Sequence, residues 1–203
     1  VIATRGVALQ APRRREGFFS ATLIWTVVPA FGALPLYQIG VVETGIDAWF
    51  EAVSGFTTTG ATVIHQLDIT EYSVLIWRAL MQWLGGLATI VLVVVLLSYL
   101  GGGGMQFFRS AMPRGGRTAM AVQIVQTLKS IGGIYCLLTI LCVLLLWLAG
   151  MTVFDSVAHA FSTISGGGFS TRDASIGAFS SPLIELVMII FMLASAVNFT
   201  LHW

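Results

Sequence analysis

Charged residues are scarce in this chain: Lys, Arg, Asp and Glu together make up only 9% of its 203 residues. Soluble globular domains carry about 25% charged residues. The shortage therefore excludes an ordinary soluble domain, and the 57% hydrophobic content predicts a membrane protein. The net charge of +1 excludes no class of protein by itself.

Cysteine is almost absent too. Cys136 and Cys142 are the only two, and on one helix they would point about 240° apart, so they cannot form a disulfide with each other there. The sequence has no nucleophile–base pair, metal-ligand cluster or phosphate loop, so we expect neither an enzyme nor a bound cofactor. The start of the chain lacks a cleavable signal pattern, and because it opens on Val1 we expect it to begin inside a longer protein.

Four hydrophobic segments have about the 20 residues, or more, that a membrane-spanning helix needs. They cover residues 18–36, 73–100, 130–149 and 182–203. Two shorter segments lie between the first and second and between the third and fourth, at 47–56 and 155–164. These are too short to cross a bilayer and too apolar for an exterior loop, so we predict two re-entrant half-helices.

The two short segments and the loops after them form an internal repeat. A shift of 108 positions aligns them without a gap and places Asp47 on Asp155, Ala52 on Ala160, Ser54 on Ser162 and Gly60 on Gly168. We therefore predict an all-α integral membrane protein of two tandem units, 18–100 and 127–203. A cytoplasmic basic segment (1–17) precedes them, and an interfacial linker (101–126) joins them. Asp47 and Asp155 are expected to cap their half-helices.

The charges predict an orientation. Eight of the ten basic residues lie before the first hydrophobic segment or between the second and third, which places these parts in the cytoplasm: Arg5, Arg13, Arg14, Arg15, Arg109, Arg114, Arg117 and Lys129. Seven of the nine acidic residues lie on the other side: Glu43, Asp47, Glu51, Asp68, Glu71, Asp155 and Asp173. They would either concentrate cations at an outer entrance or act as ordinary solvated loop charges.

The loop after each half-helix suits a bare cation. Selecting a dehydrated ion requires several oxygen dipoles at fixed distances, which backbone carbonyls supply, and glycine permits the backbone conformations involved. The predicted selectivity filter consists of Thr57, Thr58, Thr59, Gly60, Ser165, Gly166, Gly167 and Gly168.

Several motifs resemble the TrkH potassium-uptake family of the Trk/Ktr/HKT superfamily. Residues 50–62 (FEAVSGFTTTGAT) resemble its first pore loop, and the likeness covers nearly the whole chain. Further matching motifs are REGF at 15–18, QWLGG at 82–86, GGMQ at 103–106 and GGFSTRDASIG at 167–177.

The resemblance implies four units of the form M1–pore helix–M2 around one potassium path, with a filter glycine in each, here Gly60 and Gly168. In plant relatives, serine at the first such glycine accompanies sodium transport, so Gly60 favours potassium. The resemblance also implies a lipid-embedded, multi-pass homodimer in the bacterial inner membrane, with a cytoplasmic nucleotide-binding subunit of the TrkA type. We expect no nucleic-acid partner, because basic residues that flank membrane helices need no further explanation. This chain matches only the first two units, which is half of a K⁺-channel-like pore, so the other half must be found elsewhere.

Two alternatives stay open from the residues. Interrupted helices also build secondary transporters, whose breaks bind substrate at the membrane midplane. A non-conducting membrane anchor with glycine-mediated helix packing would leave the half-helices unexplained. Outside the loops, we expect Arg78 to anchor an ion pair with Glu71 or Glu51. His159, which aligns with Glu51, is expected to bond locally on its half-helix.

Overall fold

The computed structural model describes residues 14–100 and 117–196, and every regular element in these two stretches is helical. The long helices are α1 (Arg14–Ile39), α3 (Tyr72–Leu100) and α5 (Arg117–Leu148), and a shorter one, α7 (Pro182–Ala196), ends the described chain. The half-length helices are α2 (Gly45–Phe56) and α6 (Val153–Ser165). Two short 3₁₀ turns, η1 (Leu67–Ile69) and η2 (Ser175–Phe179), lie in the loops that follow them.

Three of these helices are long and apolar enough to cross a membrane: Arg15–Ile39, Tyr72–Val94 and Val125–Leu148. The apolar helix α7 is shorter, and the rest of the predicted fourth segment lies outside the described residues. Large hydrophobic side chains such as Phe31 and Leu193 are exposed along the helices. Such a surface suits lipid tails or further membrane protein. The prediction of an all-α, multi-pass membrane protein is confirmed.

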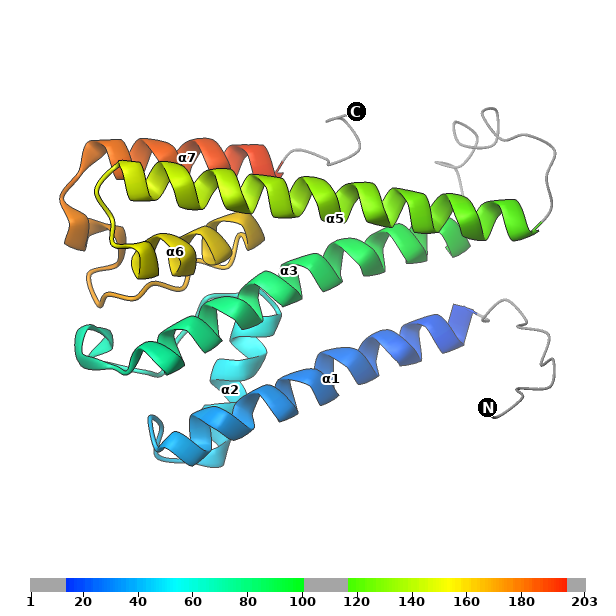
Figure 1. Ribbon diagram of the computed structural model, residues 1–203. Coiled ribbons are helices and arrows are strands. Elements are labelled where there is room, and N and C mark those ends of the chain that lie inside the picture. Colours follow the sequence, from blue (N-terminus) through cyan, green and yellow to red (C-terminus); the bar gives the residue numbers. More distant parts are fainter. Residues whose placement is uncertain (1–13, 101–116, 197–203) are drawn as a thin grey trace, which may run out of the picture.

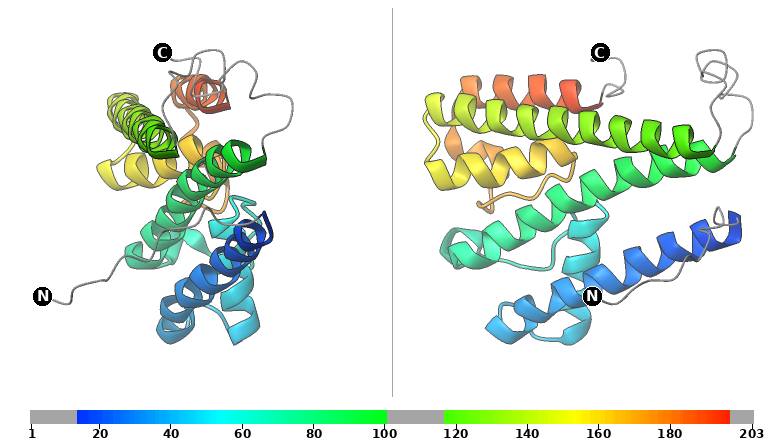
Figure 2. Two further views of the ribbon diagram at one scale, coloured as in Figure 1. Left: turned by 90° about the vertical axis from the view of Figure 1, so that its right-hand side faces the viewer. Right: turned by 45° about the vertical axis from the view of Figure 1, so that its right-hand side comes forward.

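Helix α3 lies at the centre of the arrangement. Figure 1 shows α2 between α1 and α3, and α6 between α3 and the pair formed by α5 and α7. The two further views agree that α3 separates the first half-helix from the second (Figure 2). Each half-helix therefore packs against a long helix of its own unit and also against α3.

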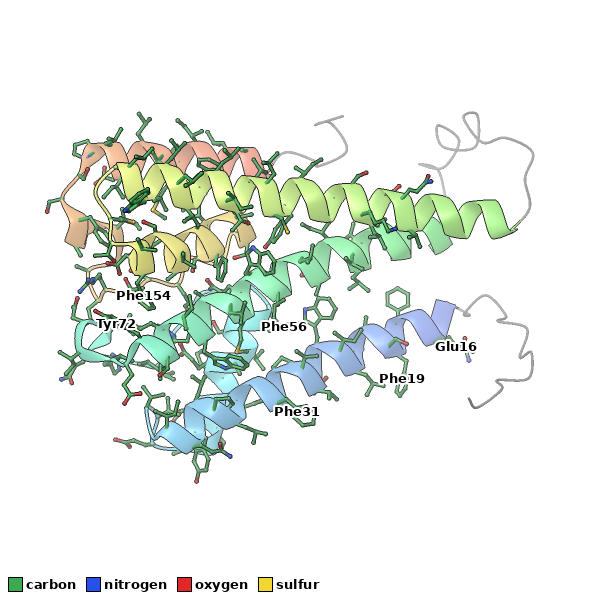
Figure 3. The ribbon with its side chains drawn as sticks, viewed as in Figure 1. Glu16, Phe19, Phe31, Phe56, Tyr72 and Phe154 are labelled. Carbon is green, nitrogen blue, oxygen red and sulfur yellow. The ribbon has the colours of Figure 1, made fainter. Side chains whose placement is uncertain are left out.

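Each unit has its own hydrophobic core. One buried cluster gathers side chains from α1, α2 and α3, including Leu36, Ala52 and Phe56. The other gathers side chains from α5, α6 and α7. An aromatic contact joins the two units: Tyr72, at the start of α3, meets Phe154 of α6 with ring centroids 4.4 Å apart (Figure 3). The two units are thus packed together rather than merely linked.

The capping prediction for the half-helices is wrong in its residues. Thr44 and Thr152 are the N-caps, and each accepts a hydrogen bond from the backbone N–H three residues later, at 3.1 Å. Asp47 and Asp155 occupy those third positions, and each accepts the hydroxyl of its threonine, at 2.7 and 2.8 Å. This reciprocal pattern resembles a capping box, with Asp in place of Glu and the threonine hydroxyl in place of its backbone N–H as the donor. The Thr-x-x-Asp spacing is the sequence signal for this arrangement.

The predicted interfacial linker is shorter than expected. Helix α5 begins at Arg117, so residues 117–126 are helical and do not belong to a linker. Arginine, alanine, methionine and glutamine make up six of the ten residues of this stretch. All four are good helix formers, so the helix extends beyond its hydrophobic part. Residues 101–116, the rest of the expected linker, lie outside the described residues.

Candidate functional site

The two loops that follow the half-helices fold back in the same way. In the first, the backbone N–H of Thr59 donates to the carbonyl of Ser54 at 2.9 Å. In the second, Gly167 donates to Ser162, also at 2.9 Å. The two donors are 108 positions apart in the chain, and so are the two acceptors. This is the same shift that aligns the two sequences. Each loop therefore turns back onto the C-terminal end of its own half-helix.

The backbone dihedrals of the two loops also correspond. Thr58 and Gly60 have φ of 55° and 77°, and the equivalent Gly166 and Gly168 have φ of 71° and 79°. The left-handed region is natural for glycine, but for a β-branched residue such as Thr58 it is a clear outlier. Strain of this kind persists where the surroundings impose it, and it gathers at functional sites.

The hydroxyl groups of the first loop bond to the loop itself and to its own half-helix. The Thr57 hydroxyl donates to the carbonyl of Val53 at 2.7 Å and lies 2.8 Å from the Thr59 hydroxyl. In the second loop, the Ser165 hydroxyl donates to the carbonyl of Phe161 at 2.8 Å. These side chains stabilise the turns, which leaves the backbone as the main source of oxygen atoms for a ligand.

The loops of the two units touch each other. A Cβ atom placed on Gly60 would lie 2.1 Å from the carbonyl oxygen of Gly167, far inside any real contact distance. The absence of a side chain at Gly60 is what lets the two backbones meet. The structure thus brings together the two predicted parts of the filter, which are more than 100 residues apart in the chain.

Two glycines of α3 seat the half-helices. A Cβ on Gly85 would lie 1.9 Å from the carbonyl oxygen of Phe56, the last residue of α2. A Cβ on Gly86 would lie 2.8 Å from the Cβ of Ser165, the last residue of α6. Adjacent glycines of one helix therefore receive the C-terminal ends of both half-helices.

A buried ion pair supports the first loop. Arg78 Nε donates to Glu51 Oε1 at 2.7 Å, and both side chains are almost completely buried. The same carboxylate accepts the Thr62 hydroxyl and the Val63 N–H, each at 2.9 Å. The Arg78 guanidinium also stacks over the ring of Phe169 in the other loop, 4.2 Å from its centroid. The predicted anchoring role of Arg78 is confirmed, with Glu51 as its partner.

A histidine supports the second loop at the equivalent position. His159 Nδ1 lies 2.8 Å from the carbonyl oxygen of Asp155, and Nε2 lies 3.0 Å from the hydroxyl of Ser170. A carbonyl oxygen only accepts, so Nδ1 carries a proton and donates to Asp155, while Nε2 shares a hydrogen bond with the Ser170 hydroxyl. The prediction that His159 bonds locally is confirmed. Within the described residues, no group of three His, Cys, Asp or Glu could hold a metal ion.

Charged side chains join the outer parts of the two loops. Arg172 belongs to the second unit, and its guanidinium nitrogens contact two carboxylates. Nη2 lies 3.2 Å from Asp155 Oδ2 of the same unit, and Nη1 lies 3.6 Å from Asp68 Oδ1 of the first unit. Asp173 Oδ1 accepts the backbone N–H of Leu67 at 3.0 Å. Asp68 and Asp173 therefore hold the two units together, and Asp155 holds Arg172 from within the second unit.

These contacts keep the carboxylates ionised. The hydrogen bond from the Leu67 N–H lowers the pKa of Asp173 below its usual value. Burial pushes the pKa of Asp155 upward, but hydrogen bonds from Thr171, Thr152 and Arg172 together hold it below the usual value. The contacts of Arg172 with Asp68 and of Asp173 with Leu67 could not be predicted from the sequence. Nothing in the local pattern of either loop points to the other loop.

Comparisons with known proteins agree with the geometry. The family described as "TrkH: Cation transport protein" matches residues 3–203. The chain is 47% identical to the Trk system potassium uptake protein TrkH of Salmonella typhimurium and 41% identical to TrkG of Escherichia coli. Each match covers 94% of this chain and 40% of the relative, so the chain spans about two fifths of the length of these curated relatives.

A solved structure shares the fold. The crystal structure of the potassium transporter TrkH from Vibrio parahaemolyticus superposes with a TM-score of 0.82 at 45% sequence identity. The match covers 98% of this chain and 39% of that one. On these grounds, the chain belongs to the TrkH family of cation transport proteins.

Proposed function

We propose that this chain forms half of a potassium-uptake pore and that the backbone carbonyls of its two loops select the dehydrated ion. The observation that carries the proposal is the contact between Gly60 and Gly167, which places two loops of the same conformation against each other. Several backbone carbonyls can then face one space, as the coordination of a bare cation requires. The named relatives are potassium uptake proteins, which supports potassium as the ion.

The half-helices add to the attraction for a cation. Each ends directly before its loop, α2 at Phe56 and α6 at Ser165. The C-terminal end of a helix carries roughly half a negative charge, and its effect extends over the last turn. We infer that both helices direct this negative end toward the ion. The proposed filter residues remain those predicted from the sequence: Thr57, Thr58, Thr59, Gly60, Ser165, Gly166, Gly167 and Gly168.

The proposal requires a second half of the pore. Two loops cannot surround an ion, and the relatives are more than twice as long as the matched region. We propose that the remaining units of a longer protein complete the ring. The family resemblance further supports a homodimer in the bacterial inner membrane that binds a TrkA-type regulatory subunit.

Substitution of the filter glycines in the full-length protein tests the proposal. Gly60→Asp or Gly168→Asp should abolish potassium-dependent growth of a host that lacks its own uptake systems, because each places a charged side chain at a left-handed backbone position of a loop. Gly45→Asp and Gly177→Asp are matched controls, since both glycines have open space around them and ordinary backbone conformations. Normal growth with either filter variant, at normal levels in the membrane, would refute the filter assignment.

A further inference from the structure

The side chain of Gln82 is fully buried and belongs to one unit, but its hydrogen bond reaches the loop of the other. Gln82 lies on α3, and its Oε1 accepts the backbone N–H of Phe169 at 3.1 Å. That N–H belongs to the peptide group whose carbonyl is the oxygen of Gly168. The described residues contain no cis peptide bond, and in a trans peptide the N–H and C=O groups point in opposite directions. The hydrogen bond therefore turns the Gly168 carbonyl away from α3.

On its Gly168 side, this peptide is not held by packing. Gly168 has φ of 79°, and a Cβ placed on it would meet no atom within 4 Å. A peptide next to an unpacked glycine rotates readily, because no side chain restricts it. The Phe169 ring is held by Arg78, and the direction of the Gly168 carbonyl is set by the partner of the Phe169 N–H, which is Gln82.

The carboxamide of Gln82 also occupies the place of a side chain at Gly167. A Cβ on Gly167 would lie 2.3 Å from Gln82 Cδ and 2.5 Å from both Nε2 and Oε1. Gly167 is not among the residues with positive φ, so its conformation alone would accept alanine. The fit against Gln82 therefore makes glycine necessary at this position.

Within the described part of the chain, the amide nitrogen of Gln82 does not contribute a hydrogen bond to the fold. Gln82 Nε2 is buried and has no hydrogen-bond partner among the described residues. It lies 3.8 Å from the position that a Cβ on Gly60 would take, at the junction of the two loops. A buried donor without a partner destabilises a fold, so a hydrophobic side chain of equal size would suit stability better.

We propose that Gln82 is a positioning residue for ion selectivity, which holds the 168–169 peptide of the second loop from the first unit. It acts through the Gly168 carbonyl and does not touch the ion. The inference rests on the proposed function, because it assigns that carbonyl to the ion path. It also gives a role to the QWLGG segment, in which Gln82 orients a loop while Gly85 and Gly86 seat the half-helices.

Two substitutions of similar size in the full-length protein separate the hydrogen bond from packing. Gln82→Glu keeps an oxygen acceptor for the Phe169 N–H, whereas Gln82→Met has nearly the same length without a good acceptor. The preference for K⁺ over Na⁺ can be measured as the inhibition of rubidium uptake into cells by added K⁺, compared with its inhibition by added Na⁺. We expect Gln82→Met to lose roughly five- to ten-fold of this preference, the equivalent of one hydrogen bond. Its KM for K⁺ should rise more than its maximal rate falls, and Gln82→Glu should retain most of the preference.

Thr139→Val is the control for a structural effect. It removes the 3.0 Å hydrogen bond from Trp83 Nε1, the neighbour of Gln82 on α3, without touching a loop. This variant should lose stability but keep the wild-type preference for K⁺. An unchanged preference in Gln82→Met would overturn the inference. A wild-type protein that carries no K⁺ would instead overturn the proposed function.

A double substitution tests the same geometry if Gln82→Met fails to fold. Gly167→Ala should lower the amount of folded protein that survives heating in detergent, because the new methyl group meets the Gln82 carboxamide. In a Gln82→Ala background, the same Gly167→Ala change should cost much less, since the space is free. Equal costs in both backgrounds would show that Gln82 does not occupy the face of Gly167.

Discussion

Gly60→Ala and Gly168→Ala each add one methyl group, but they should destabilise the protein by different amounts. The difference in stability measures how closely the two loops meet. Gly60 and Gly168 have nearly the same backbone conformation, with φ of 77° and 79°. Alanine in the left-handed region costs about 1–2 kcal/mol at either position. The surroundings differ, because the new methyl group at residue 168 would have open space, whereas that at residue 60 would meet the Gly167 carbonyl.

The size of the difference follows from that contact. The Cβ of Gly60→Ala would lie 2.1 Å from a backbone oxygen, so one of the loops must move by about an ångström. Overpacking of a fixed interior costs about 1–3 kcal/mol. We therefore expect a total of roughly 2–5 kcal/mol for Gly60→Ala against roughly 1–2 kcal/mol for Gly168→Ala.

Two measurements check this expectation in the full-length protein. Folded protein remaining after a heating series in detergent reports stability, and rubidium uptake at limiting concentration reports transport. Gly60→Ala should be the less stable variant and should lose more uptake, because it displaces the Gly167 carbonyl as well as its own loop. Equal losses in the two variants, or a larger loss in Gly168→Ala, would refute the contact between the loops.

Three further predictions concern the supports of the loops. Glu51→Gln should destabilise the protein by about 3–5 kcal/mol, because it leaves Arg78 charged and buried without its partner; heating in detergent measures this, and full stability would contradict the ion pair. Thr58→Gly should raise stability by about 0.5–1 kcal/mol in the same assay, because glycine removes the strain at φ of 55°; a loss would show that the threonine side chain is needed. The pKa of Asp155 is lower in the folded than in the unfolded protein. The ionised carboxylate therefore stabilises the fold at any pH above the unfolded pKa, near pH 4, and this stabilisation disappears as the pH falls through the folded pKa. Thermal stability should therefore decline below about pH 4, and Asp155→Asn should flatten that decline; an unchanged slope would argue against the bonded carboxylate.

Much of the architecture could be predicted because it depends on local composition. Runs of hydrophobic residues predict membrane helices wherever they occur, and segments too short to cross predict re-entrant ones. The pair of Arg78 with Glu51 could also be expected, because a buried charge requires a partner. The caps could have been found from the Thr-x-x-Asp spacing at Thr44 and Thr152, while the early start of α5 was hidden by its polar residues.

The sequence by itself determined that this is an all-α membrane protein with two similar loops of glycine and hydroxyl residues. Only the tertiary structure decided that these loops touch, with Gly60 against Gly167, and that Gln82 bonds to Phe169 across 87 positions of the chain. The physical reason is the range of the interactions. Hydrophobic runs and turn residues act within a few positions, whereas the contacts that orient the carbonyl groups exist only once α3 has packed against both half-helices.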